Sequence, residues 1–300
     1  MKTYDQLLGH LAVAGAYTIF GLNLVFCKDI ANSDVLSPML LFTLRAIGAA
    51  ALFWLLSLFQ PREPVARKDI GLIVLASFVG LFVPQLTFLK AITISATIDA
   101  SVMHTLSPIF TMFFAFFFLK EPITWKKALG VAVSFGGVLL LIFNSVHAEG
   151  AVSKTEPWGF VLLVLNSLSF ALYLGAFRKL ISRYSVVTFM KWTFLFSLIL
   201  SLPFSAKELV TADYAAIPRG VVWEIAFLIF FATFVAYFLI PYGQKRIRPT
   251  LVSMYSYLQP IIATVISILT GLDVITWQKA LATLLVFAGV WLVIRSRAAA

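Results

Sequence analysis

The stretch ITWKKAL at residues 123–129 recurs as ITWQKAL at residues 275–281, 152 positions further along the chain. The same offset holds without a gap across 96–142, and it aligns Pro108 with Pro260. Apolar residues can match through composition alone, but a repeated run with a tryptophan, a lysine and an aligned proline is hard to reach by chance. The sequence therefore indicates an internal duplication.

The composition around this repeat is that of a membrane protein. Hydrophobic residues make up 61% of the chain and charged residues 12%, whereas soluble domains are roughly 45–50% apolar and about 25% charged. Because about 20 apolar residues cross a bilayer as a helix, and lipid offers the backbone no partners, each long apolar segment should be helical. We therefore predict an all-α integral membrane protein with ten transmembrane helices. The expected spans are 7–27, 38–59, 70–89, 94–119, 125–144, 158–177, 186–204, 221–242, 250–270 and 277–294.

Charge predicts the orientation of these spans. Of the 23 Lys and Arg residues, 15 lie in loops on the side of the N-terminus and 6 in loops on the opposite side. The positive-inside rule then places both termini in the cytoplasm, with the chain in the cell membrane, inner or plasma. This bias explains the net charge of +10 without nucleic acid as a partner. The single cysteine, Cys27, excludes an intramolecular disulfide and a thiolate metal site.

The two halves should be inverted copies, because each has five spans and five is odd. Residues 120–127 carry three lysines, whereas their counterpart at 272–279 carries one. Before the fourth span of each half the order reverses, since 245–248 carries three basic residues and its counterpart none. We predict one repeat over 1–147 and a second, inverted repeat over 148–300.

Motif residues of one known family occur in both halves. They are Asn23, Lys28, Pro38, Arg45, 95–97, 106–108, 119–124 and 130–137 in the first half, and 258–260, 275–277 and Gly289 in the second. On these residues the chain resembles the EamA-type branch of the drug/metabolite transporter superfamily, with two EamA repeats. It departs from the pattern at Asp273, where the family has glutamate, and Arg45 has no clear counterpart in the seventh span. The resemblance implies that helices one to four and six to nine surround a site for small organic solutes, such as amino acids and related metabolites.

Polar side chains inside apolar spans mark the candidate site, because each is costly without a partner. Arg45 should either pair with Asp99 or the backbone, or contact the substrate. His104 is either a hydrogen-bonded packing residue or a titrating group that couples transport to protons. The cavity-lining candidates are Asn23, Arg45, Gln85, Asp99, His104, Asn166, Tyr173, Tyr255 and Gln259. Trp192 and Tyr237 are weaker candidates that could face lipid, and Lys191 could snorkel to the headgroups.

Prolines and glycines suggest where helices bend and where they pack closely. Prolines within spans remove a backbone donor, so each marks an expected kink, either structural only or shared around one cavity. These kink positions are Pro84, Pro108, Pro241 and Pro260. Glycines at 130, 136, 137 and 289 predict tight packing of the fifth and tenth spans, which then serve as scaffold.

The motifs that are missing narrow the function. No GxxxxGK[ST], HExxH or GxSxG pattern occurs, and the three histidines share no ligand spacing, so we expect no metal and no cofactor and do not expect an enzyme. We predict a secondary transporter that works by alternating access on amino acids or related metabolites, as an exporter or a proton-coupled exchanger in contact with membrane lipid. A channel or receptor-like protein without a carrier cycle stays the alternative, and an intramembrane enzyme is the least favoured one.

Overall fold

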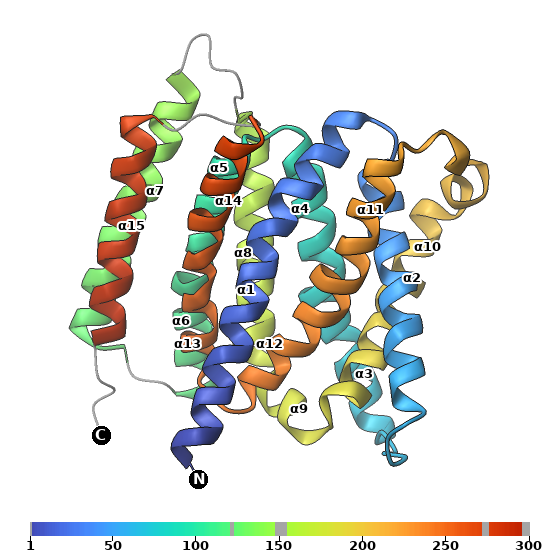
Figure 1. Cartoon of the computed structure of the whole chain (residues 1–300). Helices are drawn as coiled ribbons and strands as arrows, with labels where there is room; N and C mark the ends of the chain where they lie inside the picture. The colour runs from blue at the N-terminus through green and yellow to red at the C-terminus, as the bar shows by residue number, and fades with distance from the viewer. Residues whose placement is uncertain (1, 121–122, 148–154, 272–275, 296–300) are drawn as a thin grey trace.

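The computed structural model describes residues 2–120, 123–147, 155–271 and 276–295, and every element within them is helical (Figure 1). The first half contains α1 (Lys2–Ser33), α2 (Pro38–Ser57), α3 (Arg67–Ser77), η1 (Phe78–Phe82), α4 (Val83–Thr93), α5 (Thr97–Met103), η2 (His104–Leu106), α6 (Ser107–Leu119) and α7 (Trp125–His147). The second half contains α8 (Pro157–Ala176), α9 (Arg178–Arg183), α10 (Val186–Thr211), η3 (Tyr214–Ala216), α11 (Arg219–Phe227), η4 (Leu228–Val235), α12 (Ala236–Gln244), α13 (Pro249–Met254), η5 (Tyr255–Tyr257), α14 (Leu258–Leu269) and α15 (Trp277–Arg295).

Seven of the ten expected spans coincide with helices that are long and apolar enough to cross a membrane. These are Tyr4–Ser33, Pro38–Ser57, Arg67–Thr93, Thr97–Leu119, Pro157–Ala176, Val186–Thr211 and Arg219–Gln244. The other expected spans fall on α7, on α13 to α14 and on α15, whose described residues do not meet the same criterion of length and hydropathy. Residues 121–122, 148–154 and 272–275 lie outside the described residues, so the predicted boundary between the repeats and the Asp273 substitution do too.

Local sequence sets several helix ends. Ser37 caps α2 by accepting a hydrogen bond from the Leu40 N–H at 3.1 Å, and Pro38 follows at the first helical position. Lys120 ends α6 with a φ of 57°, a left-handed conformation that usually takes glycine. The seventh span is longer than expected: α10 runs to Thr211 rather than ending near 204.

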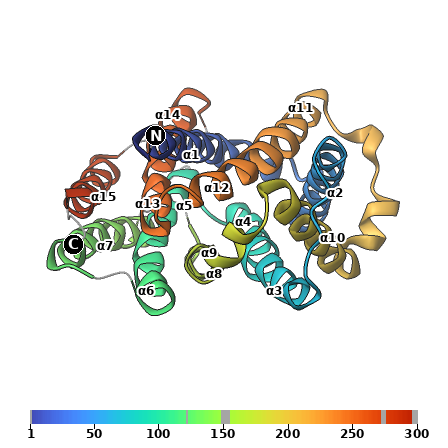
Figure 2. The ribbon, with the colours of Figure 1, turned by 90° about the horizontal axis from the view of Figure 1, so that it is seen from below.

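The helix contacts of one half are repeated by the corresponding helices of the other half. Helix α1 packs against α12 and α14, and α8 packs in the same way against α4 and α6. Counterparts also contact each other, α2 with α10 and α7 with α15. Viewed along the bundle, α7 and α15 lie at one end and α2 and α10 at the other, with α1, α4, α8 and α12 between them (Figure 2).

Helices α7 and α15 run antiparallel, so the recurring tryptophans that begin them lie at opposite ends of the bundle (Figure 1). Their backbones approach closely at Gly289, where an added Cβ would lie 2.2 Å from the Gly130 carbonyl oxygen. This contact agrees with the tight packing expected for these two glycines. The expectation was wrong for Gly136, where an added Cβ would meet nothing within 4 Å.

The third, fourth, eighth and ninth spans each contain a stretch of irregular helix. The third and eighth contain the π-helices η1 and η4, and the fourth and ninth contain the 3₁₀ turns η2 and η5. Pro84 and Pro108 are each the second residue of the α-helix that follows and Pro260 is the third, whereas Pro241 lies deeper, inside α12. Pro203, inside α10, was not among the predicted kink positions. The two halves therefore interrupt the same spans in the same manner.

Candidate functional site

A cavity lies in the middle of the bundle, between the two halves. Its empty space, including the open mouth, is about 580 Å³. Helices α1, α2 and α4, the η2–α6 junction, α8, α12 and the η5–α14 junction all contribute side chains. The lining residues are Tyr17, Phe20, Asn23, Leu24, Arg45, Pro84, Gln85, Phe88, His104, Ser107, Asn166, Ser167, Phe170, Tyr237, Ser256 and Gln259.

Most of the candidates chosen from the sequence meet in this cavity, and three do not. The ones that line it are Asn23, Arg45, Gln85, His104, Asn166 and Gln259. Asp99, Tyr173 and Tyr255 lie elsewhere. Tyr173 is buried where an added Cβ on Gly80 would touch its ring, and the Tyr255 hydroxyl is hydrogen-bonded to His10 Nδ1 at 2.8 Å.

Arg45 is the charged side chain of the cavity, and it is only 1% exposed. Its Nε donates to Thr233 Oγ1 at 2.8 Å, and its Nη1 lies 3.7 Å from Cys27 Sγ. Of the alternatives expected for Arg45, the pair with Asp99 is not formed; Asp99 lies near the start of α5, where it accepts a hydrogen bond from Thr155 Oγ1 at 2.7 Å. Within the described parts of the chain, Arg45 is in no ion pair.

The other half holds Arg45 through an irregular stretch of helix. Thr233 lies in the π-helix η4, and its hydroxyl also donates to the Leu228 carbonyl oxygen at 2.7 Å. On the other side, the Cys27 thiol donates to Asn23 Oδ1 at 3.7 Å, which joins Arg45 to the lining of α1. Polar contacts from both halves thus fix the guanidinium at the cavity wall.

The repeat offset identifies pairs of lining residues. Gln85 and Tyr237 are 152 positions apart, and Gln85 Nε2 donates to the Tyr237 hydroxyl oxygen at 2.8 Å. The same offset relates His104 to Ser256, and Ser107 to Gln259, which also line the cavity. Tyr237 had been interpreted as a residue that could face lipid; it is 5% exposed. Applying the repeat offset to Gln85 would have found it from the sequence.

Several polar atoms around the cavity have no hydrogen-bond partner among the described residues. They are Tyr17 Oη, Gln85 Oε1, His104 Nε2, Ser107 Oγ and Ser256 Oγ. A buried polar atom without a partner costs about 1–3 kcal/mol, so atoms of this kind favour water or a polar solute beside them. The arrangement therefore suits the binding of a small polar molecule. No group of three His, Cys, Asp or Glu side chains that could hold a metal occurs in the described segments.

Comparison with known proteins identifies the family. The model of the EamA-like transporter family matches residues 7–143 and again residues 157–295. The chain belongs to the EamA-like transporter family. It is a multi-pass membrane transporter in two repeats, and its family consists of transporters of small molecules, which the site geometry suits.

Individual relatives agree with the EamA-like assignment. The chain is 25% identical over 296 residues to the uncharacterized inner membrane transporter YicL of Salmonella typhimurium, covering 95% of this chain and 94% of the relative. It is 25% identical over 247 residues to the uncharacterized transporter YyaM of Bacillus subtilis, covering 81% and 79%. A Rickettsia felis protein named S-adenosylmethionine uptake transporter is 23% identical over 185 residues, covering 62% and 58%. A solved crystal structure with a TM-score of 0.69 and 16% identity covers 97% of this chain and 96% of its own, and so shares the fold.

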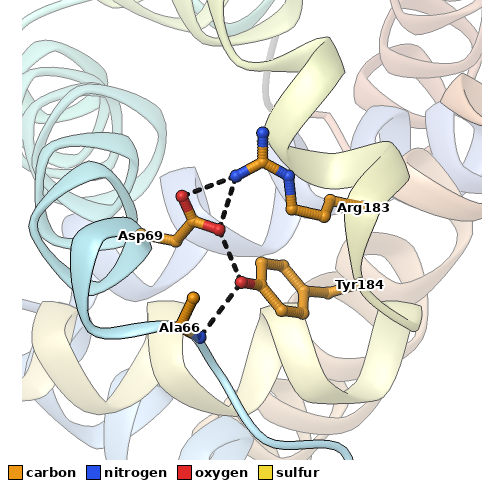
Figure 3. Close-up of polar contacts among 4 residues, drawn as sticks. All are labelled: Ala66, Asp69, Arg183 and Tyr184. Carbon is orange, nitrogen blue, oxygen red and sulfur yellow. Dashed lines mark hydrogen bonds and ion pairs between the residues drawn. The ribbon is translucent and has the colours of Figure 1, made fainter.

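A second polar cluster of this EamA-like chain joins the two halves (Figure 3), and the helices α3 and α9 that contribute to it lie at the end of the bundle where α1 begins (Figure 1). Arg183, at the end of α9, donates through Nη1 to both carboxylate oxygens of Asp69 in α3, at 2.6 and 2.5 Å. The Tyr184 hydroxyl donates to Asp69 Oδ2 at 2.6 Å and accepts from the Ala66 N–H at 3.2 Å. None of these residues is among the candidates predicted from the sequence, since each lies in a charged loop or at a helix end.

Two further contacts extend this cluster. The carboxylate of Glu63 accepts from the Ser185 N–H at 2.9 and 3.1 Å, and Lys245 Nζ donates to the Tyr184 carbonyl oxygen. Burial raises the pKa of Glu63, but hydrogen bonds from Thr188 and Ser185 outweigh it and bring the pKa below its ordinary value. Burial lowers the pKa of Lys245. Charged and backbone groups of both halves of the transporter are thus joined at this end.

Proposed function

We propose that this EamA-like transporter is an alternating-access carrier whose two five-helix halves, 1–147 and 148–300, are threaded through the membrane in opposite directions. The observation that carries the proposal is the bond between the repeat-equivalent residues Gln85 and Tyr237 inside a central cavity. A contact between equivalent residues lies where a two-fold relation between the halves would place its axis. The antiparallel course of α7 and α15 supports the inversion (Figure 1).

In this proposal the cavity holds a small organic solute, with amino acids and related metabolites as the first class to test. Arg45 offers a binding group for a carboxylate, and the unpaired oxygens of Ser107 and Ser256 offer neutral hydrogen bonds. A relative from Rickettsia felis is named S-adenosylmethionine uptake transporter, which supports including metabolites in the test. His104, whose Nε2 has no partner among the described residues, is the candidate for coupling to protons, in export or exchange.

The proposal places both termini in the cytoplasm and the chain in the inner or plasma membrane. The charge bias of the loops supports this orientation, and the relative YicL is named an inner membrane transporter. The start of α1 and the end of α15 lie at the same end of the bundle (Figure 1), as an even number of crossings requires.

Two measurements test the proposal. Single cysteines placed at Trp125 and Trp277, which are 79% and 71% exposed, should face opposite sides of the membrane. An impermeant reagent added to intact cells should therefore react with only one of the two. Labelling of both from one side would overturn the inverted arrangement.

Purified protein in proteoliposomes should show saturable uptake and counterflow of a solute found by screening amino acids and metabolites. Flux without saturation or counterflow would favour a channel.

A further inference from the structure

The charges that line the central cavity are unbalanced. Among the described residues of the lining, Arg45 carries a fixed positive charge and no aspartate or glutamate accompanies it. His104, which also lines the cavity, is a base and cannot supply the missing negative charge. Asp99 bonds to Thr155 outside the lining, and Glu224 lines a separate cavity together with Phe26 and other aromatic residues.

Arg45 keeps donors available for an anion. Its Nε is used by the Thr233 hydroxyl, while its Nη1 has only the Cys27 sulfur, a weak acceptor at 3.7 Å. The two terminal nitrogens of a guanidinium match the two oxygens of a carboxylate, and such paired bonds are strong and directional. A buried cation without an anionic partner is costly, so a bound anion would remove a penalty that the empty cavity carries.

The remaining surface of the cavity suits an apolar body rather than a second charge. Phe20, Leu24, Phe88 and Phe170 contribute apolar or aromatic side chains to the lining. The polar atoms left without partners belong to neutral groups: hydroxyls, an amide and an imidazole. These groups can bond to a keto or hydroxyl oxygen, but they cannot neutralise an ammonium, which would lie in the same small cavity as the Arg45 cation.

We propose that the cavity prefers small organic monocarboxylates with an apolar or aromatic body over the amino acids that carry the same side chain. This inference rests on the proposed carrier function and refines its substrate class. An amino acid would place its ammonium in a low-dielectric space that already holds a cation, where like charges repel strongly. A carboxylate without the ammonium makes the same bond to Arg45 and avoids the repulsion.

Matched pairs of ligands test the preference with the wild-type protein alone. We would measure dissociation constants at neutral pH, from thermal stabilisation of the purified full chain, for 4-methylpentanoate against leucine and 3-phenylpropionate against phenylalanine. Within each pair the two molecules differ by the ammonium group. We expect the monocarboxylate to bind at least tenfold more tightly in both pairs, and the uncharged amide of each acid to bind at least tenfold more weakly than the acid. Equal binding within the pairs, or tighter binding of the amino acids, would overturn the inference.

Variants then locate the charge responsible. Arg45→Gln should abolish the preference for the acid over its amide, and Arg45→Lys should keep part of it. Lys191→Gln is the matched control, since Lys191 Nζ lies 4.9 Å over the Trp54 ring and outside the cavity lining. If Lys191→Gln reduces acid binding as much as Arg45→Gln does, Arg45 is not the anchor. Saturable transport and counterflow of amino acids but not of matched acids would refute this inference and leave the carrier intact, whereas absence of counterflow for every solute would refute the carrier itself.

Discussion

Replacing Asp69 by asparagine should weaken the polar cluster that joins the two halves at the end where α1 begins. The Asp69 side chain is 2% exposed and takes charged hydrogen bonds from Arg183, which is 51% exposed, and a further bond from Tyr184. Hydrogen bonds to charged groups contribute about 1.5–3 kcal/mol, and the solvent around Arg183 reduces that value. Asparagine keeps an acceptor for Tyr184 but loses the charge. We therefore expect a loss of about 1–2 kcal/mol, which changes an equilibrium between closed and open forms of this end roughly 5–30-fold.

The assay is a distance distribution between spin labels on cysteines placed at Lys68 and Lys179, two exposed positions beside the cluster on α3 and α9. Cys27 can stay in place because it is 1% exposed. In lipid nanodiscs, Asp69→Asn should enlarge the long-distance population relative to the short one by the expected factor. A carrier that opens this end during its cycle has to separate these two positions.

Two controls make the result specific. Asp213→Asn removes an acidic group that caps η3 in the second half, and it should leave the distribution unchanged. In the double variant Asp69→Asn with Arg183→Gln, the two effects should not add: their coupling free energy should be about 1–2 kcal/mol. An unchanged distribution in Asp69→Asn, or simple additivity with Arg183→Gln, would refute the reasoning that this ion pair holds the halves together.

Two other predictions concern stability and pH. Gly289→Ala should destabilise the chain by roughly 2 kcal/mol, because the new Cβ would lie 2.2 Å from the Gly130 oxygen and this overpacking outweighs the better helix propensity of alanine. Gly136→Ala has open space around it, so it should be neutral or stabilising by up to about 1 kcal/mol. Reversible unfolding in detergent measures both, and the opposite order would contradict the packing argument. The pKa of Glu63 lies below its ordinary value, so its contribution to stability is present at neutral pH and lost as the pH falls through the lowered pKa. At neutral pH the Ser185 amide hydrogen should therefore exchange more slowly in the wild type than in Glu63→Gln, and in acid the two rates should become equal. Equal exchange rates at neutral pH would count against the contact.

Hydropathy and the repeat predicted most of the fold because both depend on properties averaged over many residues. The bounds of α2 and α8 came within a few residues of expectation, whereas α1 and α10 extend well beyond the apolar cores of their spans. Helices in a bilayer can continue past the hydrocarbon region, where hydropathy carries no signal for where they end.

Single-residue placements were harder to predict, because spans that are apolar all round carry little signal for which face points to lipid and which to a cavity. Asp99 and Tyr255 looked like cavity residues because they are polar, yet one bonds to Thr155 and the other to His10. Tyr255 begins the 3₁₀ turn η5, whose tighter winding also changes the direction of the side chains that follow. Periodicity for a regular α-helix cannot anticipate such a change.

Irregular backbone inside a membrane needs partners for its polar groups, so it persists where protein or a cavity supplies them. In this transporter the π-helix η4 of the second half uses Thr233 to bond one of its own carbonyls and, at the same time, to hold Arg45 of the first half. A movement of one half against the other would have to change this contact, and so would change how the guanidinium is presented to a solute. In the proposed carrier, solute binding and the relative position of the halves would therefore be coupled through one hydroxyl, which would give a physical reason for an interrupted helix to lie beside the buried cation of the cavity.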